Sequence, residues 1–278
     1  VRGIFMAIIS ISRQVAAHGD EVATELAKIL GYKFITRKEI EQRIVELGFP
    51  ESKMPKYDER KPGFFASLTK DRDEYLNYTQ YAILEAAKKQ NVIIIGRGSF
   101  ALLQNVQNNV SIRLIADEAT RVKRLCEEFS WDEKKALQRI QESDSNRAGF
   151  SSSFYNIDVN DFSLYHAIFN TGYVSIEDTA KIIANLVKTI VTEEKEVAGQ
   201  KTIVDLLKGQ EVVNKLYFEY HLNIDFMHVS IDGNTVLLHG VSDSPAIVEQ
   251  ALQVIRKEMP EYEAKSAVSI VHDFKTFQ

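Results

Sequence analysis

The sequence predicts two domains: an α/β domain with a mostly parallel sheet flanked by helices, followed by a small α+β domain. The chain has 278 residues, a length that suits about two domains. Short β-branched runs alternate with longer amphipathic stretches as far as residue 191, which is typical of a parallel sheet covered on both faces. Beyond residue 200 the pattern changes to two strands joined by a Gly-Asn turn and flanked by helical stretches.

The strands of the first domain are expected where β-branched residues occur at consecutive positions. Such runs favour strands that are buried on both faces. The expected strands are 7–12, 32–36, 92–96, 110–115 and 165–169. Between and after them, apolar residues recur with helical spacing, which predicts helices over 20–30, 71–89, 118–129, 132–142 and 175–191.

Two segments interrupt this alternation. Residues 45–70 contain Pro50, Pro55 and Pro62 among charged side chains, and we expect an irregular insertion or lid there. Residues 193–199 are polar and end in glycine, so we expect a linker. The first domain is then 1–192 and the second 200–278.

The second domain is expected to be a helix, two strands, a helix and a last strand with antiparallel pairing. The expected ranges are 203–221, 226–232, 235–241, 244–259 and 264–272. A two-residue turn at Gly233-Asn234 places Val229 opposite Leu238, and it places Ile231 opposite Val236, so that one face of the hairpin is apolar.

The same register sets His228 opposite His239. Two facing histidines are potential metal ligands, but no carboxylate or cysteine of ligand spacing accompanies them. We therefore expect an ordinary solvated polar face at this position.

Composition limits the classes of function. Hydrophobic residues make up 45% of the chain and charged residues 26%, which is typical of a folded globular protein. The net charge of −5 leaves no overall positive field, so we expect neither nucleic acid nor a membrane as a partner. Anionic ligands must then be bound by local groups.

Location is predicted from the cysteine count and from hydropathy. The single cysteine, Cys126, excludes an intramolecular disulfide, and its place on an apolar helix stripe indicates a packed thiol. No run approaches the ~18 apolar residues of a membrane span. The apolar stretch 3–9 lacks a following cleavage site of the secretory type. We expect a cytoplasmic protein.

The first candidate site is the segment 12–20, which joins the first strand to the first helix. At such a junction, backbone N–H groups and a helix N-terminus can hold phosphate. Against the phosphate-loop pattern G-x-x-x-x-G-K-[ST], Arg13 takes the place of the first glycine and His18 that of the second, while Gly19 replaces the lysine and Asp20 the hydroxyl residue. The same residues also suit a structural turn in which Asp20 caps the helix.

The second candidate is Gly96-Arg97-Gly98, which follows the most apolar strand. Ligands of open α/β sheets bind at the carboxyl ends of the strands, and an arginine there can bind phosphate through two hydrogen bonds. A simple glycine turn with a solvated Arg97 is the alternative interpretation.

The third candidate is a helix end that carries Arg139, Ser143, Asp144 and Arg147 and runs into a loop, 148–155, rich in serine and aromatic residues. Mobile arginines that close over phosphates suit phosphoryl transfer, which depends on positioning and charge neutralisation. An exposed helix end with i,i+4 pairs is the alternative interpretation.

Taken together, these motifs resemble the cytidylate kinase-like family, a branch of the nucleoside monophosphate kinases with the P-loop kinase fold. The resemblance covers residues 6–192 and depends on the ordered spacing of several segments. These segments are 9–14, the helix up to Gly31, 93–98, 112–116 with Arg121 and Arg124, 143–147, and 169–171 with 175–178.

The resemblance implies transfer of the γ-phosphoryl group of ATP to a (d)CMP-like acceptor, with ATP and Mg²⁺ as cofactors. It implies catalytic roles for Arg139, Asp144 and Arg147, and substrate binding by Arg37 and Arg97. No protein residue is assigned to metal. The residues implied in binding the nucleotide cofactor are Ser12, Arg13, Gln14, His18, Gly19, Asp20 and Arg121.

Two departures from the family pattern support an alternative. Relatives often read Ser-Arg-Gln-x-Gly-Ser-Gly-Gly at the loop, whereas this chain has Ala16-Ala17-His18 before Gly19. In authentic cytidylate kinases an aspartate follows the Gly-Arg pair, and here Gly98 follows it. The alternative is a catalytically degraded kinase fold that acts as a nucleotide-binding regulatory or scaffolding module.

Residues 200–278 resemble a BON (transport-associated) domain through the segment 229–240 and the helix after it. That resemblance implies binding or assembly, with a protein partner or a second copy of the chain, rather than catalysis.

Overall fold

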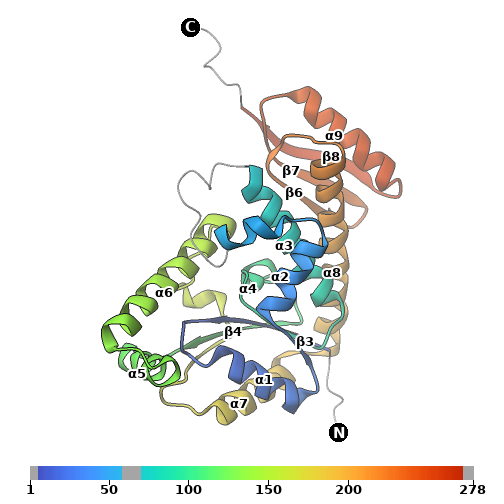
Figure 1. The fold of residues 1–278 in the computed structure, drawn as a ribbon. Helices are drawn as coiled ribbons and strands as arrows, with labels where there is room; N and C mark the ends of the chain where they lie inside the picture. Colours follow the sequence, from blue (N-terminus) through green and yellow to red (C-terminus); the bar gives the residue numbers. More distant parts are fainter. Residues whose placement is uncertain (1–5, 58–69, 272–278) are drawn as a thin grey trace. The chain divides into compact units, whose positions relative to one another are not determined.

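The computed structural model describes residues 6–57 and 70–271, and the chain divides into two units, residues 1–202 and 203–278 (Figure 1). Residues 193–199, where a linker is expected, form the first turns of helix α8 (Glu193–Asn214). Acidic residues in the first turn, Glu193, Glu194 and Glu196, suit the positive end of a helix, which explains why this charged segment is helical.

The first unit contains a sheet of five parallel strands in the order β2-β3-β1-β4-β5, which confirms the predicted fold class. Its strands are β1 (Ile8–Arg13), β2 (Lys33–Ile35), β3 (Val92–Ile95), β4 (Asn109–Ile115) and β5 (Ala167–Asn170). The central strands β1 and β3 are almost wholly buried, as their continuous apolar runs predict.

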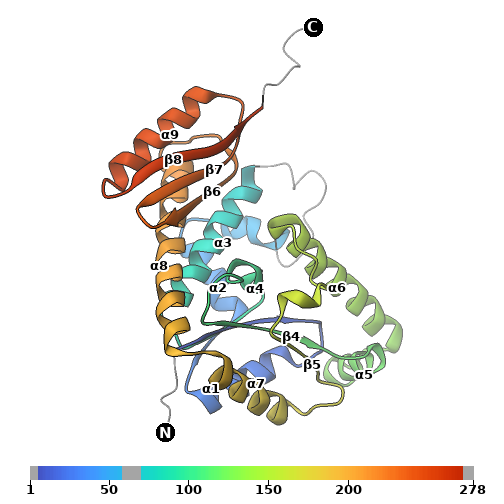
Figure 2. The ribbon, with the colours of Figure 1, turned by 180° about the vertical axis from the view of Figure 1, so that it is seen from behind.

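Helices cover both faces of this sheet (Figures 1 and 2). Helices α1 (Gly19–Leu30) and α7 (Ile176–Ile190) lie side by side on one face, and α2 (Arg37–Glu46), α3 (Lys70–Lys88) and α4 (Ser99–Leu102) lie on the other. Helices α5 (Glu118–Phe129) and α6 (Glu133–Tyr155) pack against each other beyond β4. Short 3₁₀ helices are formed by Glu51–Lys56 and Phe162–Leu164.

Helix α6 is longer than predicted. The loop expected at 148–155 is instead the last part of this helix, because its aromatic residues have helical spacing and are buried. Phe150 lies 4.6 Å from Phe154 between ring centroids, and Phe154 also contacts the rings of Tyr57 and Tyr75. Serine and aromatic content favoured a loop in the sequence, whereas burial of the i,i+4 aromatic pair stabilises the helix.

The expected insertion at 45–70 is described only in part, since residues 58–69 lie outside the described ranges. Helix α2 precedes it and was missed in the sequence, although Thr36 and Glu39 form a capping box at its start. Phe49 and Tyr57 are buried and contact each other. The described part of the insertion is therefore packed into the fold.

The second unit has the element order that the sequence predicts. After α8 and a π-helical turn at Lys215–Glu219 come β6 (Asp225–Asp232), β7 (Thr235–Ser242), α9 (Pro245–Glu258) and β8 (Glu263–Ile270). Strands β6 and β7 are antiparallel, as expected. Strand β8 is instead parallel to β7, because α9 carries the chain back before β8 begins.

The hairpin register is confirmed. Val229 pairs with Leu238, and the rings of His228 and His239 stack with centroids 4.2 Å apart. His239 Nε2 lies 2.8 Å from Ser230 Oγ, and burial followed by the charge of His228 lowers the pKa of His239. Within the described residues, no three His, Cys, Asp or Glu side chains cluster as metal ligands would.

None of the helices in the described ranges is both long enough and apolar enough to cross a membrane.

Candidate functional site

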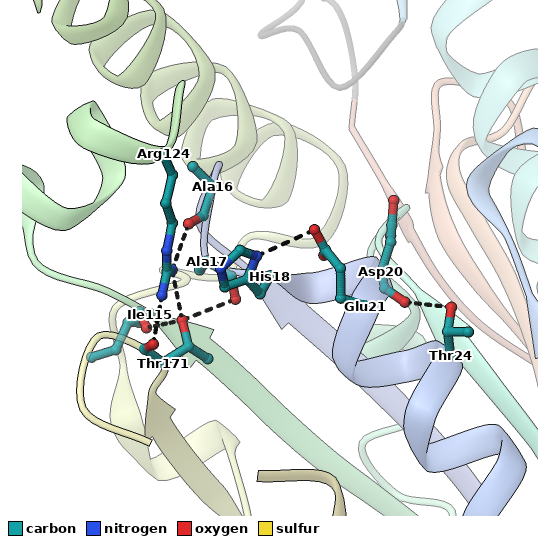
Figure 3. Close-up of polar contacts among 9 residues, drawn as sticks. All are labelled: Ala16, Ala17, His18, Asp20, Glu21, Thr24, Ile115, Arg124 and Thr171. Atoms are coloured by element: carbon teal, nitrogen blue, oxygen red, sulfur yellow. Dashed lines mark hydrogen bonds and ion pairs between the residues drawn. The ribbon is translucent and has the colours of Figure 1, made fainter. Parts of the chain in front are cut away.

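The loop between β1 and α1 has two non-glycine residues in the left-handed region. Ala16 has φ 56° and His18 has φ 54°, and both stand where the family pattern has glycine. The helix begins at Gly19 with His18 as its N-cap, so the expectation that Asp20 caps it is wrong. His18 makes no capping hydrogen bond, and its Nδ1 lies 3.2 Å from Glu21 Oε1 (Figure 3). The first-turn N–H groups of α1 therefore lack a side-chain cap, which is the arrangement that binds anions.

Side chains from α5 and the end of β5 fix this loop (Figure 3). Arg124 donates from Nη1 to the Ala16 carbonyl at 2.9 Å and from Nη2 to the Thr171 carbonyl at 2.6 Å. Thr171 Oγ1 donates to the Ala17 carbonyl at 3.2 Å. Burial lowers the pKa of Arg124, while the nearby carboxylates of Glu21 and Asp117 act in the opposite direction and raise it. Tertiary hydrogen bonds thus hold the loop where glycine is missing.

The side chain of Arg13 packs directly against Gly19. A Cβ atom at Gly19 would lie 2.8 Å from Arg13 Cγ, so the arginine stem covers the glycine. The phosphate-loop pattern has glycine at the first of these positions and lysine at the second. The chain has exchanged the small and the cationic residue between the two positions.

A pocket of about 90 Å³ opens beside the loop, at the carboxyl ends of β1 and β3 and against α6. It brings together the first two candidate segments and part of the third. Its lining residues are Ser12, Arg13, Gln14, Gly96, Arg97, Gly98, Phe100, Arg113, Asp144, Arg147, Ala148, Phe150, Ser151, Val159 and Asn160. The charged residues of this lining are four arginines and one aspartate, so the pocket suits an anion.

Arg97 is buried, with 2% of its surface exposed, and is not the solvated turn residue of the alternative interpretation. Its Nη2 forms an ion pair with Glu41, and its Nη1 donates to the Tyr57 carbonyl at 2.7 Å. Arg37 Nε donates to the same carboxylate at 2.6 Å. Burial alone raises the pKa of Glu41, but the two arginines outweigh it and hold that pKa below its ordinary value. Glu41 therefore links both residues that the resemblance assigns to the substrate.

Gly98 is required by its neighbour Tyr155. The glycine has φ 74°, and a Cβ atom there would come within 2.0 Å of the Tyr155 ring. The Tyr155 hydroxyl donates to the Arg97 carbonyl at 3.2 Å, and burial raises the pKa of that hydroxyl. The ring fills the space that the aspartate of authentic cytidylate kinases would need.

The candidate catalytic residues on α6 differ in whether they line the pocket. Asp144 lies in the pocket lining, where Oδ2 accepts from Arg121 Nη1 at 2.6 Å and Oδ1 accepts from the Val15 N–H at 3.4 Å. Arg147 lines the pocket as well. Arg139 lies outside the lining, with 48% of its side chain exposed and its Nη1 3.7 Å from Glu142 Oε2.

Among the charged lining residues, Arg113 was missed in the sequence. Arg113 belongs to β4, has 5% of its surface exposed, and donates from Nη1 to Ser12 Oγ at 2.9 Å. Its Nη2 donates to Asn160 Oδ1 at 3.3 Å, and its guanidinium lies over the Tyr165 ring. The signal was an arginine within a strand expected to be buried on both faces.

The chain is similar in sequence and in fold to known proteins. The chain is 25% identical over 187 residues to the cytidylate kinase of Pyrobaculum islandicum, covering 67% of this chain and 95% of the relative. It is 26% identical over 172 residues to the cytidylate kinase of Methanocaldococcus jannaschii, covering 60% and 92%. The crystal structure of an uncharacterised protein from Eubacterium ventriosum shares the fold, with a TM-score of 0.53, 20% identity and coverage of 66% and 99%.

The model of the cytidylate kinase-like family matches residues 8–173, which include both the loop and the pocket. The resemblance noted in the sequence is thereby confirmed at the level of the family, and the chain belongs to the cytidylate kinase-like family.

Proposed function

We propose that the first unit is a nucleoside monophosphate kinase that transfers the γ-phosphoryl group of ATP to a (d)CMP-like acceptor. The observation that carries this proposal is the arginine-lined pocket beside the uncapped N-terminus of α1, in a chain of the cytidylate kinase-like family. The two features supply adjacent positions for two phosphate-bearing molecules.

ATP is assigned to the loop. The N–H groups at the start of α1 point toward a ligand at the helix end, and the helix dipole favours its negative charge. Arg13 supplies the cation that the phosphate-loop lysine would otherwise give, from the strand that leads into the loop. Gln14 Oε1 accepts from the Ala116 N–H at 3.2 Å, which fixes the loop's exit from β1.

The transferring group is assigned to the boundary between loop and pocket. Arg147 lines the pocket from α6, and Asp144 joins α6 to the loop through Val15 and to α5 through Arg121. Phosphoryl transfer needs positioning and charge neutralisation more than covalent catalysis. Asp144 then orients Arg121 and the loop, and Arg147 neutralises charge that develops on the transferring oxygens.

We assign Mg²⁺ to Asp20, a carboxylate at the start of α1. Asp20 is an exposed carboxylate in the first turn, and its side chain has no partner among the described residues. Mg²⁺ in nucleotide sites is held by one or two carboxylates together with phosphate oxygens. When bound, the ion neutralises phosphate charge. Asp20 would hold it, and without a cation this carboxylate would repel ATP.

A coupled assay of ADP release with CMP, dCMP, UMP and AMP tests the proposal. We expect turnover with at least one acceptor, and we expect Arg147→Ala to lower kcat/KM by roughly 10²-fold or more, as loss of a charge-stabilising donor does in other enzymes. Arg256→Ala, which removes an exposed arginine of α9, is the matched control and should leave the rate unchanged. Absence of turnover with every acceptor would reject the kinase assignment.

The second candidate function is a nucleotide-binding module without catalysis. It is favoured by the loop, which lacks the lysine and two glycines, and by the Tyr155 ring in place of a carboxylate at position 98. Calorimetry that finds nucleotide binding in a chain without turnover would support it. Turnover that depends on Arg147 would exclude it.

For the second unit we propose a BON-like role in binding or assembly. One face of its sheet packs on helices through Val236 and Leu238, while much of β8 is exposed. Sedimentation velocity of the full chain over a range of concentrations tests self-association. A monomer at every concentration would contradict assembly of the chain with itself.

A further inference from the structure

Arg113 differs from Arg97 and Arg121 in what surrounds its charge. Arg97 is paired with Glu41. Arg121, which reaches the pocket through Asp144, is paired with that aspartate. Arg113 is 95% buried, and its described contacts are with neutral groups: two hydrogen bonds to Ser12 and Asn160, and the ring of Tyr165.

No carboxylate in the described ranges forms an ion pair with Arg113. A guanidinium has five N–H donors and stays charged at any pH that a folded protein experiences. Burying such a charge without an ionic partner is unfavourable, so a buried arginine normally has a counter-anion. Here the pocket is the place where that anion fits, because Arg113 lines it.

The arrangement of the pocket indicates which molecule brings the anion. His18, Gly19 and Asp20, at the start of α1 where ATP is assigned, do not line this pocket. Arg13 and Gln14 line it from the end of β1, together with residues that follow β3 and residues of α6. The two arginines that the resemblance assigns to the acceptor, Arg37 and Arg97, both share the carboxylate of Glu41. Much of their charge is thus neutralised within the protein.

We propose that Arg113, with Ser12 and Asn160 holding its guanidinium in position, binds the phosphate group of the acceptor. This inference rests on the proposed kinase function and assigns the phosphate contact of the acceptor to a strand residue instead of to Arg37 and Arg97. Ser12 and Asn160 fix the guanidinium from two sides, which leaves its remaining N–H groups for two parallel hydrogen bonds to phosphate.

The test compares ligands that differ only in the phosphate. Calorimetry is run with CMP, cytidine, inorganic phosphate and ATP on the full chain, on Arg113→Met and on Arg113→Lys. Methionine keeps an unbranched apolar stem of similar length without the charge, and lysine keeps the charge without the planar fork. Arg256→Met on the exposed face of α9 is the control.

We expect Arg113→Met to weaken CMP and phosphate binding by roughly 10-fold or more and to leave cytidine and ATP affinities unchanged. Arg113→Lys should recover part of the CMP affinity. The midpoint of thermal unfolding of the ligand-free Arg113→Met variant should equal or exceed that of the wild type, because an unpaired buried charge has been removed. A residue that only fixes Ser12 and Asn160 would lower that midpoint and leave the preference for CMP over cytidine intact.

The outcomes separate this inference from the kinase proposal. Equal CMP and phosphate affinities in wild type and folded Arg113→Met would overturn the inference even if turnover is measured. So would a wild type that binds neither CMP nor phosphate, or a loss of ATP affinity as large as the loss of CMP affinity. Phosphate and CMP binding that depend on Arg113 in a chain without turnover would reject the kinase proposal and leave the phosphate site in place.

Discussion

The loop at residues 14–20 and the pocket beside it are built from the same strands, yet they differ in how their shape is maintained. In the loop, Ala16 and His18 adopt left-handed backbone conformations in place of glycine, and hydrogen bonds from Arg124 and Thr171 hold the backbone. In the pocket, shape depends on buried side chains that fill space.

The difference also concerns charge. The loop has lost its lysine, whereas the pocket lining holds four arginines. Compared with the phosphate-loop pattern, the cationic groups therefore lie on the strands, at their ends and on α6 instead of at the start of the helix. A loop held by a few hydrogen bonds should tolerate change better than a pocket held by packing, because overpacking a filled site costs more than one hydrogen bond does.

The largest expected effect is at Gly98 in the pocket. Replacing it by aspartate restores the family residue but forces a Cβ atom into the Tyr155 ring. We expect a loss of about 3 kcal/mol in the free energy of unfolding, from the clash together with the left-handed backbone. Urea denaturation measures this loss.

A matched control and a double variant test whether the Tyr155 ring causes this loss of stability. Gly31 has φ 70° and no atom within 4 Å of its Cβ position, so Gly31→Asp isolates the backbone cost and should lose only about 1 kcal/mol. The loss caused by Gly98→Asp should be smaller in a Tyr155→Ala background than in the wild type. Equal losses at Gly31 and Gly98 would show that the ring does not occupy this space in solution.

The second effect concerns the carboxylate that joins Arg37 and Arg97. Glu41→Gln leaves the buried Arg97 without its ionic partner, and we expect a loss of about 2 kcal/mol at pH 7, reduced from the fully buried case because Glu41 is partly exposed. The pKa of Glu41 is lower in the folded than in the unfolded chain. Its contribution is therefore complete above the unfolded value of about 4.3 and is lost as pH falls through the folded value.

The difference between wild type and Glu41→Gln should accordingly shrink below pH ~4. Unfolding curves between pH 7 and pH 3 measure it. Glu46→Gln, at an exposed ion pair with Arg43 on the same helix, is the control and should change stability by less than about 0.5 kcal/mol. A constant difference across this pH range would contradict the ion pair with Arg97.

These residues also show which parts of the structure could be predicted. The strands followed from continuous β-branched runs, and the hairpin register followed from one turn, because both signals are local. The end of α6 was missed, because the contacts of Phe154 with Tyr57 and Tyr75 join segments distant in the chain.

For the candidate site, too, some residues could be predicted from the sequence and others could not. Arg13 and Arg97 were placed by their positions at strand ends, and Asp144 and Arg147 by an expected helix end that in the structure continues to Tyr155; all four line the pocket. The link from Glu41 to Arg97 and the role of Tyr155 could not be predicted, since both depend on tertiary packing that the spacing of residues does not encode.

The third prediction concerns the hydroxyl that holds the loop. Thr171→Val keeps the shape of the side chain but leaves the Ala17 carbonyl without that donor, and we expect a loss of about 1–2 kcal/mol. Amide exchange of residues 15–19 should become faster in the variant. Thr189→Val removes an exposed hydroxyl that donates to Asn185 within α7, and as the control it should change neither quantity appreciably.

The smallest expected effect is a gain at His18. Glycine at this position relieves the left-handed conformation of a residue with a Cβ, offset in part by the greater freedom of glycine in the unfolded chain, so we expect a gain of about 0.5–1 kcal/mol. ATP should also bind more tightly, because the imidazole no longer stands at the start of α1. Glu21→Gln removes the negative charge that Glu21 presents to His18 without changing the backbone, and it should leave stability almost unchanged. A loss of stability in His18→Gly would mean that the imidazole, and not the hydrogen bonds of Arg124 and Thr171, maintains the loop.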